Sequence, residues 1–178
     1  MKFLSIFTLI LTVFAFTACD DDGGSGNSQY NGIYEVTTSQ ERTSCGSGEW
    51  NEMTLEEDFF LLEGIDFMGT PVIGWSFCTG QTSDTCDDSF DLMMSFVLED
   101  GEWVQYMDSS STMGETCWLS RTRGYIEKTD TGVIVTSTTW EGNVTLDAGE
   151  ECDYELIDKY ISELGCGRES VIEADKVN

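Results

Sequence analysis

Apolar and polar residues alternate over several stretches of the chain, which is the pattern of half-buried β-strands. In residues 32–37, Tyr34 and Val36 fall on one face, and Glu35 and Thr37 fall on the other. Strands are also predicted at residues 59–67, 72–77, 91–99, 103–107, 117–128 and 133–141; alternation is clear in 91–99, and β-branched residues dominate 133–141.

Short turns separate most of these stretches. Asp100-Gly101 lies between two predicted strands, and an Asp-Gly pair is typical of a tight β-hairpin with positive φ angles. Gly69-Thr70-Pro71 and residues 129–132 predict two more turns. Residues 42–57, 79–88 and 108–111 are polar and are predicted to be loops. Hairpins that follow one another in this way predict an antiparallel meander.

The last part of the chain permits two interpretations. Residues 144–146 and 152–156 would form one more hairpin around an Asp147-Ala148-Gly149 turn. Apolar residues after position 155 instead recur at helical spacing, and Gly165 is placed as a C-terminal cap. We expect a short strand that passes into a helix, followed by a polar tail at 169–178. The helical positions are Leu156, Ile157, Tyr160, Ile161 and Leu164.

Seven or eight strands in a meander predict a mainly β fold, either an antiparallel up-and-down barrel or a β-sandwich, with a possible short C-terminal helix. Gly32-Ile33-Tyr34-Glu35-Val36 resembles the GxWxx start of lipocalin-like domains, with Tyr34 in place of the family's Trp. This resemblance covers five residues. It implies a barrel whose mouth accepts a small apolar ligand. The candidate ligand-binding residues are Trp75, Met93, Met94 and Trp103; alternatively, these large side chains simply fill the barrel.

The first 18 residues have the form of an export signal. Lys2 precedes an apolar and hydroxyl run over residues 3–16, which is shorter than the roughly 20 residues of a membrane-spanning helix. Phe16-Thr17-Ala18-Cys19 resembles the lipobox of bacterial lipoproteins, with Phe16 where Leu is usual. The resemblance implies that Cys19 becomes the mature N-terminus and carries fatty-acyl chains such as palmitate. The alternative is an ordinary signal peptide that is cleaved after Ala18.

The mature chain is expected to have three parts. Residues 19–30 form a flexible, acidic Gly/Ser linker behind the lipidated Cys19, residues 31–168 form the β domain, and residues 169–178 form the tail. The protein is therefore expected to be exported and anchored to a bacterial cell membrane, on its periplasmic side or at the cell surface. The acidic start of the linker fits either an inner-membrane retention signal or a surface-export signal.

Six cysteines remain when Cys19 is set aside, and an even number in an exported chain predicts three disulfides. Only the pair Cys78 and Cys86 is close enough in sequence to suggest a local bridge. A zinc site is disfavoured because the chain has no histidine and no CxxC pair. The six are Cys45, Cys78, Cys86, Cys117, Cys152 and Cys166.

The charge of the chain excludes one class of partner. Acids outnumber bases by 34 to 8, and removal of residues 1–18 takes away one lysine and no acid, which changes the net charge from −26 to −27. Such a surface lacks the basic stripe that neutralises phosphates, so we expect no nucleic-acid partner. Membrane contact is expected through the lipid alone.

The residue types also limit catalysis. Without histidine, a Ser-His-Asp triad and a Cys-His dyad are excluded. A glycosidase-like carboxylate pair or an oxygen-ligand calcium site remains conceivable, but we expect neither enzyme activity, metal nor cofactor. The carboxylates considered for these roles are Glu56, Glu57, Asp58, Asp84, Asp87 and Asp88.

Two functions therefore stay open, with a carboxylate-dependent hydrolase as a remote third. The first is a non-catalytic interaction module of the cell envelope that contacts a protein or a glycan. The second is a lipocalin-like carrier of a small apolar ligand. An apolar interior cavity above about 300 Å³ would favour the carrier, whereas a filled interior with an exposed aromatic patch would favour the interaction module.

Overall fold

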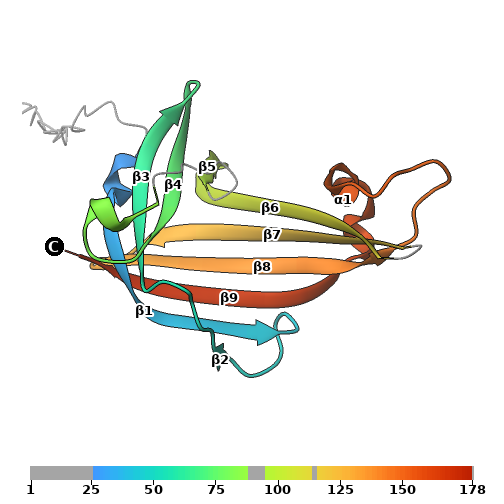
Figure 1. Ribbon diagram of the computed structural model, residues 1–178, viewed down its shortest axis with the longest axis horizontal. Helices are drawn as coiled ribbons and strands as arrows, with labels where there is room; N and C mark the ends of the chain where they lie inside the picture. Colours follow the sequence, from blue (N-terminus) through green and yellow to red (C-terminus); the bar gives the residue numbers. More distant parts are fainter. Residues whose placement is uncertain (1–25, 88–94, 114–115, 178) are drawn as a thin grey trace, which may run out of the picture.

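The computed structural model describes residues 26–87, 95–113 and 116–177. Its strands form one antiparallel sheet in the order β2-β1-β3-β4-β5-β6-β7-β8-β9, and β1 also pairs with β9. This last pairing closes eight strands into a barrel, and the short β2 pairs with the far end of β1, along the same edge as β3 (Figure 1). Neighbours in the barrel are consecutive in sequence apart from β2, so the topology is up-and-down.

The strands are β1 (Gly32–Thr43), β2 (Asn51–Glu52), β3 (Phe59–Phe67), β4 (Thr70–Cys78), β5 (Phe96–Glu99), β6 (Glu102–Met113), β7 (Thr116–Lys128), β8 (Gly132–Val144) and β9 (Gly165–Lys176). The helical elements are η1 (Ser28–Tyr30), η2 (Ser83–Thr85), η4 (Tyr154–Leu156), α1 (Ile157–Tyr160) and η5 (Ile161–Glu163). Among the described residues, no helix is long and apolar enough to cross a membrane.

The mainly β fold is confirmed, and of the two architectures the barrel is the one formed. The predicted hairpin at Asp100-Gly101 is also confirmed, because both residues have positive φ angles, of 52° and 90°, and Glu99 pairs with Glu102. The turn between β3 and β4 lies one residue earlier than predicted. Met68 and Gly69 form it with φ angles of 53° and 86°, and Thr70 already belongs to β4.

Two segments that the sequence suggested were irregular are strands. Residues 108–111, predicted as a loop, continue β6, because their backbone pairs with β7 as far as Met113 and Thr116. The predicted tail at 169–178 is largely β9, which pairs with β1 on one side and β8 on the other. Its small inward residues Ser170 and Ala174 alternate with charged outward residues, so the strand looks polar in sequence although it closes the barrel.

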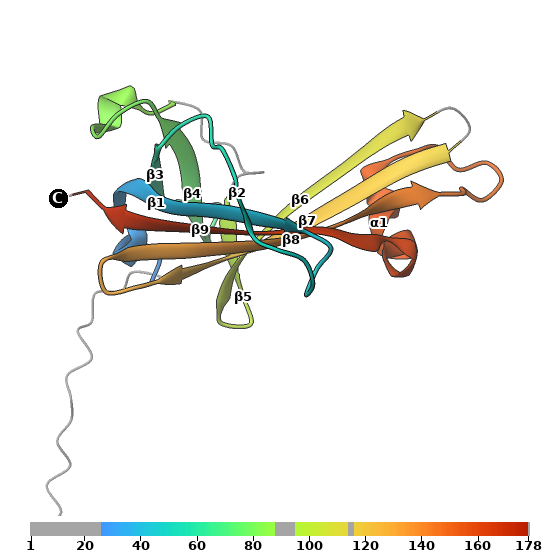
Figure 2. The same ribbon diagram turned by 90° about the horizontal axis from the view of Figure 1, so that it is seen from below.

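The predicted hairpin over residues 144–156 is wrong, and the helical alternative is confirmed. Ile157 and Tyr160 are buried on one face of α1 and pack with Leu119 and Val144 on the outer face of the sheet. This cluster lies where β6, β7 and β8 extend past the rest of the barrel (Figure 2). Gly165 begins β9 and has no capping role.

Aromatic residues fill the closed end of the barrel. Phe60 stacks between Tyr34 and Trp75, with ring centroids 5.5 and 4.2 Å away, and Phe96 lies beyond Trp75 at 6.2 Å. The Tyr34 hydroxyl donates to the backbone oxygen of Tyr30 over 2.7 Å, and burial raises the pKa of Tyr34, so its phenol stays neutral. The closed end is therefore a packed core.

The linker ends earlier than expected, because residues 27–30 belong to the folded domain. Asn27 is buried, and its Nδ2 donates to the backbone oxygens of Ile65 and Val72 at 3.0 and 3.1 Å. The η1 turn lies against β3 so closely that a Cβ on Gly64 would meet the Asn27 backbone at 2.7 Å. These contacts fix the N-terminal end of the described chain to the barrel.

The three predicted disulfides are present. Cys78–Cys86 closes the local loop, as its short spacing suggested. Cys117–Cys152 ties the segment before η4 to β7, and Cys45–Cys166 joins the end of β1 to the start of β9. The last bridge therefore reinforces the seam at which the barrel closes.

Candidate functional site at the barrel mouth

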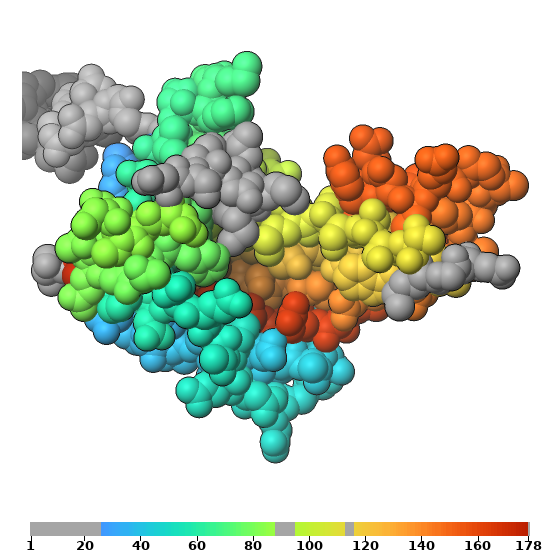
Figure 3. Space-filling model, viewed as in Figure 1, coloured from blue at the N-terminus to red at the C-terminus, as the bar shows by residue number. Residues whose placement is uncertain are grey.

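The mouth of the barrel is hollow, in contrast to its closed end. The hollow lies between β4 and β6, with β8 and β9 at its base (Figure 3). The cavity has a volume of about 240 Å³. Its lining residues come from five strands, β4, β6, β7, β8 and β9, and from the segment after β2. They are Met53, Leu55, Trp75, Phe77, Gln105, Met107, Thr122, Val135, Ser137, Thr139, Arg168, Ser170 and Ile172.

The strand register explains why polar side chains enter the cavity. Inward positions repeat every second residue, so β8 contributes Val135, Ser137 and Thr139 in successive layers. The Ser137 and Ser170 hydroxyls lie 2.7 Å apart, and those of Thr122 and Thr139 lie 2.8 Å apart. In each hydroxyl pair one proton makes the shared hydrogen bond, which leaves the other proton available. The wall of the cavity is thus apolar at its deep end and carries hydrogen-bonding hydroxyl groups nearer its opening.

Two donors in this wall have no partner within the described protein. They are the indole Nε1 of Trp75 and the amide Nε2 of Gln105, in side chains whose residues are 7% and 6% exposed. An unpaired buried donor costs about 1–3 kcal/mol, and such groups are rare in folded proteins. Both nitrogens are covered in this structure, and both belong to side chains that line the cavity.

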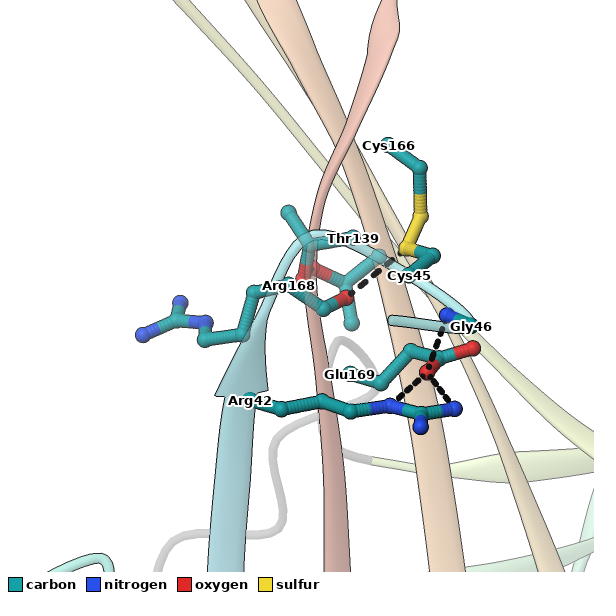
Figure 4. The surroundings of a disulfide bond; sticks show 8 residues. Arg42, Cys45, Gly46, Thr139, Cys166, Arg168 and Glu169 are labelled. Atoms are coloured by element: carbon teal, nitrogen blue, oxygen red, sulfur yellow. Dashed lines mark hydrogen bonds and ion pairs between the residues drawn. A yellow bond between two sulfur atoms is a disulfide. The ribbon is translucent and has the colours of Figure 1, made fainter. Parts of the chain in front are cut away.

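Of the described residues in the lining, Arg168 is the one that carries a charge. Figure 4 shows its side chain directed away from Glu169, as expected for consecutive strand residues on opposite faces. Glu169 lies outside the barrel, where the Gly46 backbone N–H and Arg42 donate to its carboxylate and lower its pKa. Arg168 has a weaker partner: its Nη1 lies 3.4 Å from Oε2 of Glu41, and its side chain is 54% exposed.

The sequence identified this site only in part. Of the candidate ligand-binding residues, Trp75 lines the cavity, whereas Trp103 is buried in the closed end, where its ring lies edge-on to Tyr30 at 6.1 Å. Met93 and Met94 lie outside the described residues. Gln105 was detectable, because it lies two positions after Trp103 and shares its face of the predicted strand.

Five of the six carboxylates considered for catalysis or metal binding are described by the structure, and none of these five lines the cavity. Glu56, Asp58, Asp84 and Asp87 are exposed, Glu57 is half-buried, and Asp88 lies outside the described residues. In the part of the chain that the structure describes, no group of three or more acidic or cysteine side chains is arranged to hold a metal ion.

Comparisons of this chain with protein-family models, with curated proteins and with solved structures found no match. The case for a function therefore rests on the geometry of the cavity.

Proposed function

We propose that this domain binds a small organic molecule in the mouth of its barrel, without transforming it. The observation that carries the proposal is a cavity bordered by two unpaired buried donors, Trp75 Nε1 and Gln105 Nε2. A ligand with an apolar body and a hydrogen-bond acceptor would cover the apolar base and satisfy at least one donor. This function is closer to a carrier or a receptor than to a structural module.

The size of the cavity limits the ligand. Its volume of about 240 Å³ does not reach the roughly 300 Å³ set above as favouring a carrier, so the proposal rests on the unpaired donors and not on cavity size. It is also below the 300–1,000 Å³ that is typical of drug-sized ligands, so a short-chain or single-ring molecule is expected. The alternative, a protein-interaction module, has less support. Exposed large apolar residues, such as Met68 (91% exposed), Leu98 and Tyr154, are distributed over separate hairpins and the helical segment.

The proposal predicts that blocking the cavity abolishes binding. The test uses the mature chain with Cys19→Ser, which omits only the lipid, and measures binding of octanoate and octanamide by ligand-observed NMR. Ser137→Phe places a ring in the cavity and is expected to remove the signal, whereas Thr136→Phe, which is exposed on the outer face of the same strand, leaves it unchanged. Absence of binding by the parent chain, or equal binding by both variants, would contradict the proposal.

We also propose that the barrel is exported and held at a bacterial membrane by lipid on Cys19. The lipobox-like junction supports this, and so does the pairing of the other six cysteines, because disulfides form in oxidising compartments. Mass spectrometry of the mature protein is expected to find an N-terminal Cys19 that carries acyl chains. An unmodified Cys19 or Asp20 at the N-terminus would show that this assignment is wrong.

A further inference from the structure

The charge of the cavity is opposite to that of the whole molecule. The chain carries 34 acidic and 8 basic residues, yet among the described residues that line the cavity there is no carboxylate, and the one charged side chain is that of Arg168. The remaining polar groups of the lining include the unpaired N–H donors of Trp75 and Gln105. A site built from donors and one cation is complementary to an anion.

The ion pair of Arg168 is longer than those of Lys159 and Arg121, although Arg123 lies still farther, at 3.6 Å, from Glu99. The contact of Arg168 with Glu41 is 3.4 Å, whereas Lys159 lies 2.6 Å from Asp147 and an Nη atom of Arg121 lies 2.6 Å from Asp108. An exposed ion pair at the longer distance contributes little stability, so its guanidinium is free to bind a second carboxylate. Glu41 does not line the cavity and would compete with that ligand.

The strand register places the Arg168 side chain nearer the opening of the cavity than the apolar residues at its deep end. Arg168 pairs with Thr139, and Ser170 and Ile172 follow on the same face, opposite Ser137 and Val135. A ligand with its charged end at Arg168 therefore extends its apolar part past the hydroxyl layer toward Ile172, a depth of two strand repeats.

We infer that the mouth selects a small amphiphilic carboxylate, with its carboxylate at Arg168 and its apolar chain directed toward Val135 and Ile172. This inference rests on the proposed ligand-binding function and names the chemical class of the ligand. Long-range electrostatics oppose it, because a net charge of −26 attracts cations and repels anions. If the protein nevertheless prefers the anion, that preference must come from the groups of the cavity and not from the net charge of the molecule.

The test compares three ligands with the same alkyl chain and different head groups: octanoate, octanamide and octylamine. Dissociation constants are measured by calorimetry on the mature Cys19→Ser chain at low salt and neutral pH. Octanoate is expected to bind about tenfold more tightly than octanamide, as for one charge-assisted hydrogen bond, and octylamine is expected to bind most weakly. The advantage of octanoate should decrease as salt is added.

Three variants assign the effect to residues. Arg168→Gln is expected to remove the advantage of octanoate over octanamide, whereas Glu41→Gln, which removes the competing carboxylate, should strengthen octanoate binding severalfold. Lys128→Gln changes the net charge by the same amount as Arg168→Gln at an exposed position outside the cavity, and should leave the preference intact.

The outcomes separate this inference from the proposed function. Equal affinity for octanoate and octanamide, or tightest binding of octylamine, would overturn the carboxylate inference while ligand binding stands. Persistence of the octanoate preference in Arg168→Gln would also overturn it. If none of the three ligands binds the parent chain, both the inference and the proposed function fail.

Discussion

A chain that ends at Arg168 is expected to lose its folded structure entirely. The truncation removes most of β9, which pairs with β1 on one side and with β8 on the other. Loss of this strand leaves the edges of β1 and β8 unpaired, and it deletes the buried Ala174 together with Ile172, so the core residues that these two side chains cover become exposed. The total stability of a domain is about 5–15 kcal/mol, and loss of a central strand exceeds what such a margin tolerates.

Near-UV circular dichroism and thermal unfolding provide the measurement. The truncated chain should show no cooperative transition, whereas a control chain that ends at Val177 retains all of β9 and should unfold like the parent. Native-like dichroism and a cooperative transition in the chain ending at Arg168 would show that β9 does not close the barrel.

Phe60→Ala is expected to destabilise the domain by about 3–5 kcal/mol, the range for removing a buried aromatic side chain. Phe60 is 1% exposed, and its ring stacks on both Tyr34 and Trp75. Loss of the Phe60 ring leaves a cavity between the rings of Tyr34 and Trp75. These two rings are held in place by their own strands. The free energy of unfolding is to be measured by urea denaturation.

The matched control is Phe67→Ala at the other end of the same strand. Phe67 is 39% exposed, and its replacement should cost at most about 1 kcal/mol. If the two variants lose similar free energies of unfolding, the aromatic series does not form the core that the structure shows.

Sequence pattern was sufficient where local chemistry determines local structure. The apolar stretch ended by a turn signal gave the bounds of β3 correctly, and the positive φ angles that an Asp-Gly pair favours identified the hairpin at Asp100-Gly101. Sequence pattern failed where pairing with another strand, and not the local residue pattern, decides the conformation. The serines of β6 are held by β7, and β9 carries few large apolar residues because its inward positions face the cavity mouth or closely packed neighbours.

The candidate site was less predictable than the fold, for two physical reasons. A register shift in β1 between Val36 and Thr38 changes which residues face inward, so the alternation seen at the start of β1 does not extend to Ser39 and Glu41. The position of Arg168 depends on the pairing of β9 with β1 and β8, which are far from it in sequence. An unpaired donor such as Trp75 Nε1 is recognisable only once all its neighbours are placed.

The central claim is that a ligand occupies the barrel mouth and engages the donors in its wall. The most direct measurement is a titration of the mature Cys19→Ser chain with octanoate, followed through the indole N–H resonance of Trp75, which Trp75→Phe assigns. The account predicts that this resonance shifts in a saturable way while the indole resonance of Trp103, buried at the closed end, changes little. A Trp75 resonance that does not move at saturating octanoate, or that moves no more than that of Trp103, would contradict the account.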